Sequence, residues 1–480
     1  MATRREVVVT GVGVVSPIGI GAEAFWAALI DQRSGIRDLT LCNGSRLPWT
    51  IGGEVVGFEP QRFVRPRKSL KVMSRDIQLA FAAAELACGE AGLGSGAVDP
   101  DRLGVVFGAE LIPCDPLELA ATVRRCLVRG EFDFSRWGDS MEAEMHPLWM
   151  LKYLPNMPAC HIGIARDARG PNNSLTLGEV SGLAAMAEAV RVIECGRADA
   201  MIAGGTSSRV QPITWSLSRA YPLSRRIDDP TRACRPFDAE RDGMVHGEGA
   251  AAFVLEERHH AKARGAAPLA RIVACTETFA ARDVRGPLLP AAHVELAGHG
   301  RAAETVEPAA SRRPDLPVRQ TETEPGLSLR EPEATPDVRL RRSSSDALVE
   351  AVAGGIRQVL ARAGWGPETL GHVNAHGLGT VEDDCREARA IRTTLGDVPV
   401  TALKGFFGNL GAGTGAVEAA ASVLALGCGL IPPTLNYRRP DPQCPLRVVH
   451  DEPLSGRPPS ALLLNQSRLG HAVALLLDLP

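Results

Sequence analysis

Short apolar runs and amphipathic helical patterns alternate along most of this 480-residue chain, which limits the folds that it can adopt. Five runs have the length and composition of buried β-strands, at residues 7–9, 103–107, 200–203, 250–255 and 461–464. Four segments place apolar residues at helical spacing, at residues 22–33, 70–91, 348–363 and 411–426. Strands that alternate with helices predict an α/β fold in which helices cover the sheets.

One long segment departs from this pattern. Residues 281–342 contain eight prolines, ten arginines and ten acidic residues, and no aromatic residue. Such a segment can bury little apolar surface, so we expect a long disordered insertion, with a docking motif inside it as the alternative. We place an N-terminal half at residues 1–262 and a C-terminal half, which contains the insertion, at residues 263–480.

Composition excludes several classes of protein. A net charge of -3 and 4% aromatic residues argue against a nucleic-acid partner. Because the sequence has no run of 18 apolar residues, we expect no membrane span. The eleven cysteines include no Cys-x-x-Cys pair, which favours a reducing cytoplasm over a disulfide framework or a structural zinc site. His372 and His376 lie across a strand and a turn, so we expect no metal site. Gly11-Val12-Gly13 lacks the rest of a dinucleotide fingerprint, so we expect no bound cofactor.

The first motif with chemical potential is a turn at Gly178-Glu179-Val180. It lies between a strand-like run at residues 174–177 and a helical pattern at residues 181–195. A strand–turn–helix unit places the turn side chain at a helix N-terminus, where many acyl-transfer enzymes carry their nucleophile. The residue here is Glu179, and an acidic residue at a helix start is also a common cap.

Three further motifs combine glycine with polar side chains. A strand delivers His376 into a glycine-rich loop, where a structural histidine is the alternative to a catalytic one. Lys404 precedes a glycine-rich turn, and Glu418 in the following helix offers the charge partner that a buried lysine needs. Residues 235–250 alternate charges and glycines before an apolar run, which indicates an ordered loop.

Together these motifs resemble the elongating β-ketoacyl-acyl-carrier-protein synthases, across residues 5–275 and 343–477. The matching segments occur in family order, and they are VVVTGVGVVSPIG, GPN, RADAMIAGG, RPFDAERDG with GEGA, NAHG, and LK with GAGTGAVEA. The resemblance implies a thiolase fold, five αβαβα layers built from two similar halves, and a dimer. It also implies fatty-acid or polyketide biosynthesis, with substrates on the phosphopantetheine arm of an acyl carrier protein.

The catalytic positions implied by the resemblance are partly substituted. Glu179 stands where the family has its nucleophilic cysteine, and Asn409 stands where elongating enzymes have a second histidine. His376, Lys404 and Glu418 match the family's first histidine, its lysine and its buried glutamate. The NQSRLGH segment at residues 465–471 replaces the phenylalanine-glycine gate that supplies an oxyanion-hole amide, so this hole is in doubt.

Loss of the cysteine changes the expected chemistry. Condensation needs a thioester that a thiolate forms readily, whereas a glutamate could form only a reactive anhydride. We therefore expect that this chain alone does not condense acyl units. The leading hypothesis is a non-condensing subunit that resembles the chain-length factors and occurs as a homodimer or as a heterodimer with an active ketosynthase.

The alternative hypothesis is a decarboxylase of malonyl-carrier protein, or another acyl-thioester enzyme. In it His376 and Asn409 stabilise the enolate, and burial or Lys404 neutralises Glu179. For docking of the acidic carrier, the resemblance points to Arg67, Lys68, Lys71 and Arg226. The alternative for the basic run at residues 62–71 is a solvated helix start.

Overall fold

The computed structural model of the chain describes residues 5–40, 50–94, 96–211, 213–214, 222–280 and 347–480. The insertion expected at residues 281–342 lies outside the described residues. Twelve strands are joined into one hydrogen-bonded sheet, which divides into two halves with the same pattern of pairing.

The N-terminal half contributes five strands, in the order β1 (Val7–Ser16), β10 (Glu248–Glu257), β9 (Ala200–Ser208), β5 (Leu103–Gly108) and β8 (Asn172–Leu175). β10 is antiparallel to both β1 and β9, whereas β9, β5 and β8 run parallel. β8 stands at the end of the sheet.

The C-terminal half repeats this order with β11 (Ala270–Phe279), β18 (His471–Asp478), β17 (Ser460–Gln466), β12 (His372–Asn374) and β13 (Pro399–Thr401). β18 is antiparallel to both β11 and β17, and β17, β12 and β13 run parallel. β15 (Arg447–Val448) extends the edge, and β1 pairs with β11 to join the halves. The two equivalent strand orders confirm the expected construction from two similar halves.

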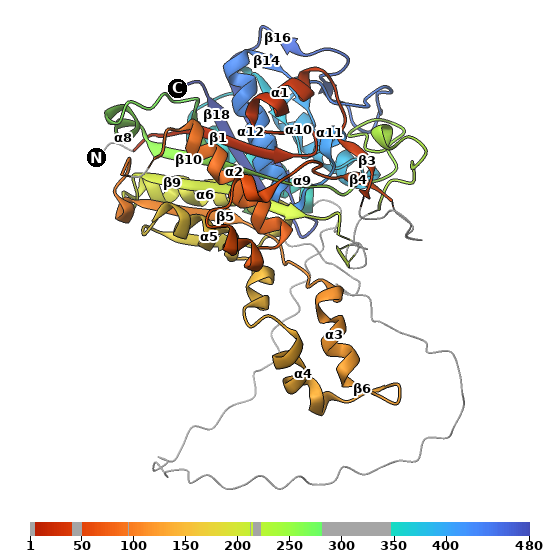
Figure 1. The fold of residues 1–480 in the computed structure, drawn as a ribbon. Coiled ribbons are helices and arrows are strands. Elements are labelled where there is room, and N and C mark those ends of the chain that lie inside the picture. The colour runs from red at the N-terminus through yellow and green to blue at the C-terminus, as the bar shows by residue number, and fades with distance from the viewer. Residues whose placement is uncertain (1–4, 41–49, 95, 212, 215–221, 281–346) are drawn as a thin grey trace, which may run out of the picture. The chain divides into compact units, whose positions relative to one another are not determined.

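Helices form three layers around these strands (Figure 1). The central layer holds α6 (Ser181–Glu194) and α12 (Thr414–Cys428), which contact strands of both halves. α2 (Arg75–Glu90) and α5 (Met157–Arg166) lie against the N-terminal strands, whereas α9 (Ala347–Ala363) and α10 (Val381–Leu395) belong with the C-terminal strands. This confirms the five-layered α/β arrangement. Gly411–Cys428 has the length and hydropathy of a membrane span, but 83% of it is buried, as in a core helix.

The first strand is longer than predicted, because its glycines do not end it. β1 continues through Gly11 and Gly13 to Ser16. A Cβ atom at Gly11 or Gly13 would collide with the carbonyl oxygen of Ala87 or Ala83 in α2. The glycines therefore allow α2 to pack closely on β1, and the strand extends well beyond the predicted residues 7–9.

The helix predicted at residues 70–91 begins later in the structure. Arg67–Val72 forms a separate 3₁₀ segment, η3, and α2 starts at Arg75. The Ser74 hydroxyl accepts a hydrogen bond from the Ile77 backbone N–H at 3.5 Å, which caps the helix. The cap accounts for the start of the helix at Arg75, whereas the apolar spacing placed it at residue 70.

The remaining elements of the described residues are short. Their α-helices are α1 (Ala22–Ile30), α3 (Pro116–Cys126), α4 (Trp137–Glu144), α8 (Arg258–Ala263) and α11 (Lys404–Phe407). The other strands are β2 (Gly19–Ile20), β3 (Ile36–Asp38), β4 (Ile51–Gly53), β6 (Leu127–Val128), β7 (Glu131–Phe132), β14 (Leu430–Ile431) and β16 (Leu454–Ser455).

Candidate active site

The predicted turn is present between β8 and α6. Gly178–Val180 forms a single 3₁₀ turn, η7, in which Gly178 has a φ of 65°, a conformation that favours glycine. The Ser181 hydroxyl accepts from the Leu177 N–H at 2.8 Å and donates to the Gly178 carbonyl at 2.7 Å. The turn therefore fixes Glu179 at the start of α6, with 4% of the residue exposed.

Glu179 is held by an arginine that the sequence analysis did not single out. Arg209, directly after β9, donates from Nη1 to Glu179 Oε1 at 2.8 Å. The same guanidinium donates from Nε to Glu110 Oε2 at 2.9 Å and contacts the other Glu110 oxygen through Nη2. The Ser207 hydroxyl also donates to Glu110, at 2.6 Å. We call Glu110, Arg209 and Glu179 the carboxylate–arginine network.

The position of this network reveals a missed signal. Arg209 is a cation beside Glu179, and the Lys404 amine pairs with Glu418, the charge partner that the sequence offered for it. Glu110 and Arg209 follow β5 and β9, two neighbouring parallel strands. Since the carboxyl ends of parallel strands meet at one edge, polar residues directly after them were a usable signal.

Glycine also makes room for the network. A Cβ atom at Gly411 would collide with Glu110 Oε2 and crowd Arg209 Nε. Gly411 has a φ of 55° and begins η10 (Gly411–Gly413), the turn before α12. The glycine-rich motif of the C-terminal half therefore lies directly against the network.

A second buried cluster joins three residues singled out in the sequence. Lys404 Nζ lies 2.7 Å from Glu418 Oε1 and 3.2 Å from His376 Nδ1, and it also donates to the His376 carbonyl. His376 follows β12, Lys404 begins α11 and Glu418 lies on α12. Each of the three is at most 2% exposed. We call these residues the lysine cluster.

Burial sets the protonation of the lysine cluster. It lowers the pKa of His376 well below its usual value, and the charges of Lys404 and Arg209 act in the same direction. Burial raises the pKa of Glu418 to about 7, although the Lys404 charge opposes that rise. His376 is therefore a neutral imidazole near neutral pH, suited to accept a proton or donate a hydrogen bond.

Carboxylates on α10 hold the His376 loop, and the sequence analysis missed them. Glu387 accepts from the backbone N–H groups of His376 and Gly377 at 2.7 and 2.8 Å. Burial raises the pKa of Glu387 to about 8. Asp384 accepts from the Gly379 N–H at 3.0 Å. Acidic residues in the helix after the glycine-rich loop were the signal in the sequence that could have identified them as partners of the loop backbone.

Asn409 supports its own turn. Its Oδ1 accepts from the Gly411 N–H and from the Thr414 hydroxyl, both at 3.1 Å, and its Nδ2 lies 3.4 Å from Met244 Sδ. Asn409 is fully buried. Its amide is therefore directed to local partners, whereas the alternative hypothesis has it act together with His376 on a substrate.

Residues 467–470, within the segment that the resemblance matches to the gate, form a tight hairpin turn. Between β17 and β18, Ser467 donates its N–H to the His471 carbonyl at 2.8 Å, and Gly470 donates to the Ser467 carbonyl at 3.1 Å. The cavity that reaches His376 is lined by Leu348, His376, Leu378, Asp383, Gln466, Ser467 and Arg468. Its volume is about 10 Å³, room for one water molecule.

The residues suggested for carrier docking lie at the surface. Arg67, Lys68 and Lys71 are exposed on η3. The Arg226 side chain is 39% exposed and lies 3.9 Å from both Glu240 and Asp242. The first three thus form an exposed basic segment, whereas Arg226 is partly neutralised by its neighbours.

Comparison with protein families identifies the family to which this architecture belongs. The model described as "Beta-ketoacyl synthase, N-terminal domain" matches residues 4–261, and "Beta-ketoacyl synthase, C-terminal domain" matches residues 338–438. The chain belongs to the beta-ketoacyl synthase family. The resemblance inferred from the motifs is confirmed, and with it the thiolase fold.

Individual relatives of this beta-ketoacyl synthase family member cover nearly the whole chain. It is 30% identical to 3-oxoacyl-(acyl-carrier-protein) synthase 2 of Synechocystis, over 93% of this chain and 91% of the relative. It is 33% identical to putative polyketide beta-ketoacyl synthase 1 of Streptomyces cyaneus, over 95% and 92%. Among solved structures, the ishigamide ketosynthase/chain length factor matches with a TM-score of 0.75 and 25% identity, over 100% of both chains. The family thus acts in fatty-acid and polyketide biosynthesis.

Proposed function

We propose that this chain is a non-condensing member of the beta-ketoacyl synthase family, similar to the chain length factors, that works as the partner of a condensing ketosynthase. One observation carries the proposal: the residue in the nucleophile position, Glu179, is a buried carboxylate held by Arg209 at 2.8 Å. A thiolate there would attack an acyl thioester, whereas a carboxylate held by a guanidinium is a poor nucleophile.

The network supports a structural role for Glu179. Arg209 is anchored on its other side by two contacts to Glu110, so its orientation is fixed. Burying charges is favourable only when they are paired and hydrogen-bonded, as they are here. The substitution is therefore accommodated by an arrangement that stabilises this turn instead of preparing it for a covalent intermediate.

Two surfaces support assembly with a partner chain. β8, directly before the Glu179 turn, stands at the end of the sheet. Nearby in sequence, residues 111–150, which include α3 and α4, expose large apolar side chains, which are Leu111, Leu117, Leu127, Phe132, Phe134, Leu148 and Met150. Phe134 is 74% exposed although its ring stacks on Trp137. A concentration of exposed apolar side chains is typical of a protein interface.

An acyl carrier protein is the second proposed partner. One similar solved structure is titled as a type II acyl-carrier protein in complex with its ketosynthase, and it matches with a TM-score of 0.72 and 25% identity. The exposed Arg67, Lys68 and Lys71 offer positive charge to an acidic carrier. The substrate would then arrive on the carrier's phosphopantetheine arm, with no cofactor bound to this chain, in the cytoplasm.

The geometry supports the decarboxylase hypothesis less well. A malonyl thioester must reach His376, but the cavity beside that residue holds about one water molecule. The Asn409 amide is also engaged within its own turn. Decarboxylation would require the hairpin at residues 467–470 to move away.

Intact-mass spectrometry tests the proposal. The purified chain and the Synechocystis relative are each incubated with acyl- and malonyl-loaded carrier protein. We expect the relative to gain the mass of an acyl group and this chain to remain unmodified. In parallel, co-expression with a condensing ketosynthase from the same host is expected to yield a stable complex.

Two results would contradict the proposal. An acyl adduct on this chain, together with a condensed product, would show that it retains synthase activity. Release of carbon dioxide from malonyl-carrier protein by this chain alone, abolished in His376→Ala, would favour the decarboxylase. The two assays use the same loaded carrier, so substrate quality is controlled within the experiment.

A further inference from the structure

Two cysteines from distant parts of the sequence meet in the C-terminal half. Cys385 lies on α10, and Cys444 lies shortly before β15. Their Sγ atoms are 3.7 Å apart. Because a disulfide has an S–S length of about 2.05 Å, the two sulfurs must approach by less than 2 Å to become bonded.

A buried arginine contacts this thiol pair. Arg241 donates from Nη2 to Cys385 Sγ at 3.0 Å and from Nη1 to Asp441 Oδ2 at 2.6 Å. Its Nε and Nη2 also donate to the carbonyls of Thr380 and Val381. The guanidinium is therefore held in a fixed position beside the Cys385 sulfur.

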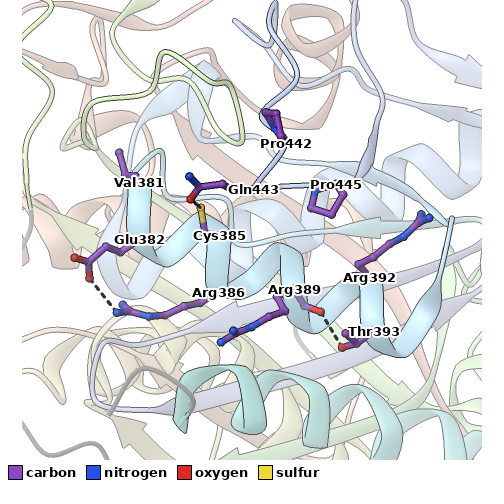
Figure 2. A pocket seen from close by; sticks show the side chains of 10 residues that line it. All are labelled: Val381, Glu382, Cys385, Arg386, Arg389, Arg392, Thr393, Pro442, Gln443 and Pro445. Carbon is purple, nitrogen blue, oxygen red and sulfur yellow. Dashed lines mark hydrogen bonds and ion pairs between the residues drawn. The ribbon is translucent and has the colours of Figure 1, made fainter. Parts of the chain in front are cut away.

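The two sulfurs differ in their access to solvent. Cys385 is partly exposed and lines a groove of about 600 Å³, together with Val381, Gln443 and Pro445. Figure 2 shows the Cys385 sulfur at the wall of this groove, next to the Gln443 side chain. Cys444 is only 2% exposed. A small oxidant reaches Cys385 first, and Cys444 is placed to react in the second step.

We propose that Cys385 and Cys444 form a redox-sensitive thiol pair, which a hydroperoxide converts to a disulfide. The Cys385 thiolate attacks one peroxide oxygen and breaks the O–O bond, which gives a sulfenic acid and, after protonation, water. Cys444 then attacks the sulfenic sulfur, forms the S–S bond and releases a second water. Overall, two thiols lose two protons and two electrons, and one hydrogen peroxide is reduced to two waters.

A bound metal explains this cluster less well. The possible ligand atoms of Cys385, Asp441 and Cys444 lie within 4.8 Å of one another. However, the Arg241 guanidinium contacts two of these three donors and would face the metal charge at short range.

The disulfide would connect α10 to the segment before β15. α10 also carries Asp384 and Glu387, whose carboxylates accept hydrogen bonds from the backbone of the His376 loop. Oxidation would therefore cross-link a helix that supports the candidate active site, at a point outside both buried charge clusters. The thiol pair does not depend on the proposed function of the chain.

The test is peroxide titration of the purified full chain, followed by alkylation and peptide mass mapping. We expect a cross-linked peptide pair that contains Cys385 and Cys444, has lost two hydrogens, and is restored to free thiols by dithiothreitol. In Cys444→Ser, a dimedone adduct should form on Cys385 about tenfold faster than on the exposed Cys428. Cys428→Ser is the matched control and should form the cross-link as the unaltered chain does.

Two outcomes would overturn the inference. One is oxidation of Cys195 and Cys428 before Cys385, with no cross-linked peptide at any peroxide concentration. The other is zinc that co-purifies with the chain and protects both Cys385 and Cys444 from alkylation until a chelator removes it. Thermal unfolding of each serine variant, measured beside the unaltered chain, shows that the result comes from the lost sulfur and not from misfolding.

Discussion

Each of the two buried charge clusters pairs a cation with a carboxylate away from solvent, and the two clusters use different cations. In the lysine cluster, one ammonium lies between the Glu418 carboxylate and the neutral His376 imidazole. In the carboxylate–arginine network, one guanidinium lies between two carboxylates. The first cluster contains Lys404 and Glu418, whereas the second holds Glu179 in the turn before α6. In both clusters a buried carboxylate is accompanied by a matched cation.

The choice of cation follows from geometry. An arginine presents several N–H donors in a plane, so Arg209 can bind Glu110 with two nitrogens and still donate to Glu179. A lysine acts more nearly as a point charge, and Lys404 accordingly lies where three acceptors converge. Exchanging the two cations would leave acceptors unpaired in the network.

The largest effect is expected for Arg209→Met. This change keeps most of the side-chain volume but leaves Glu110 and Glu179 without the cation that they share. Breaking a buried ion pair by removing one partner costs about 3–5 kcal/mol, and we expect a loss of that size in the free energy of unfolding. Denaturant titration of the variant and the unaltered chain gives the difference.

An exposed ion pair provides the control for that measurement. Arg62 pairs with Glu59 at 2.6 Å, but its side chain is 70% exposed. Arg62→Met should therefore cost less than about 1 kcal/mol. Equal losses in the two variants would mean that the network contributes no more than a surface pair, and the comparison between clusters would fail.

A smaller and pH-dependent effect is expected for Lys404→Met. The pKa of Glu418 is already raised to about 7 by burial, so this carboxyl can take up a proton when its cation is removed. A group with a raised pKa contributes stability at low pH that is lost as the pH rises through that value. Loss of Lys404 raises the pKa further, so the variant's deficit should grow with pH.

The measurement for Lys404→Met is denaturant unfolding at pH 6 and pH 8. We expect a destabilisation of about 2 kcal/mol at pH 6, and a deficit about 1 kcal/mol larger at pH 8. The matched variant Glu418→Gln removes the titrating group and should flatten this pH dependence. A deficit that shrinks towards pH 8 would contradict the assignment of the raised pKa to Glu418.

The smallest effect on stability is expected at the exposed basic segment. The double change Arg67→Glu and Lys68→Glu should alter the free energy of unfolding by less than about 0.5 kcal/mol, because neither side chain is buried. If the segment docks a carrier protein, affinity at low salt should fall about fivefold to tenfold. Titration calorimetry at two salt concentrations checks this, with Arg62→Glu as the control, and unchanged affinity would remove the docking assignment.

The five predicted strands and four predicted helices are present, because apolar patterns reflect burial, whereas β11, β18 and α10 were not predicted. The Glu179 turn and the residues of the lysine cluster were also found, because each sits in a motif with its own local signal. The start of α2 and the length of β1 were not, because Ser74 and the close packing of Gly11 on α2 outweigh the apolar spacing.

The carboxylate–arginine network escaped prediction for a different reason. Glu110 and Arg209 are 99 residues apart, and each looks like an ordinary charged residue in its own segment. They meet only because β5 and β9 pair in parallel and end at the same edge. Glu179 was singled out in the sequence, but the cation that pairs with it could be found only from the register between two strands.

The small pocket beside His376 has a consequence for the proposed role of this chain. Its volume of about 10 Å³ leaves no room for an acyl chain next to that residue. Under the proposed function, the chain would influence product length through the walls that it contributes to a chamber shared with its partner, and not by binding the product beside His376.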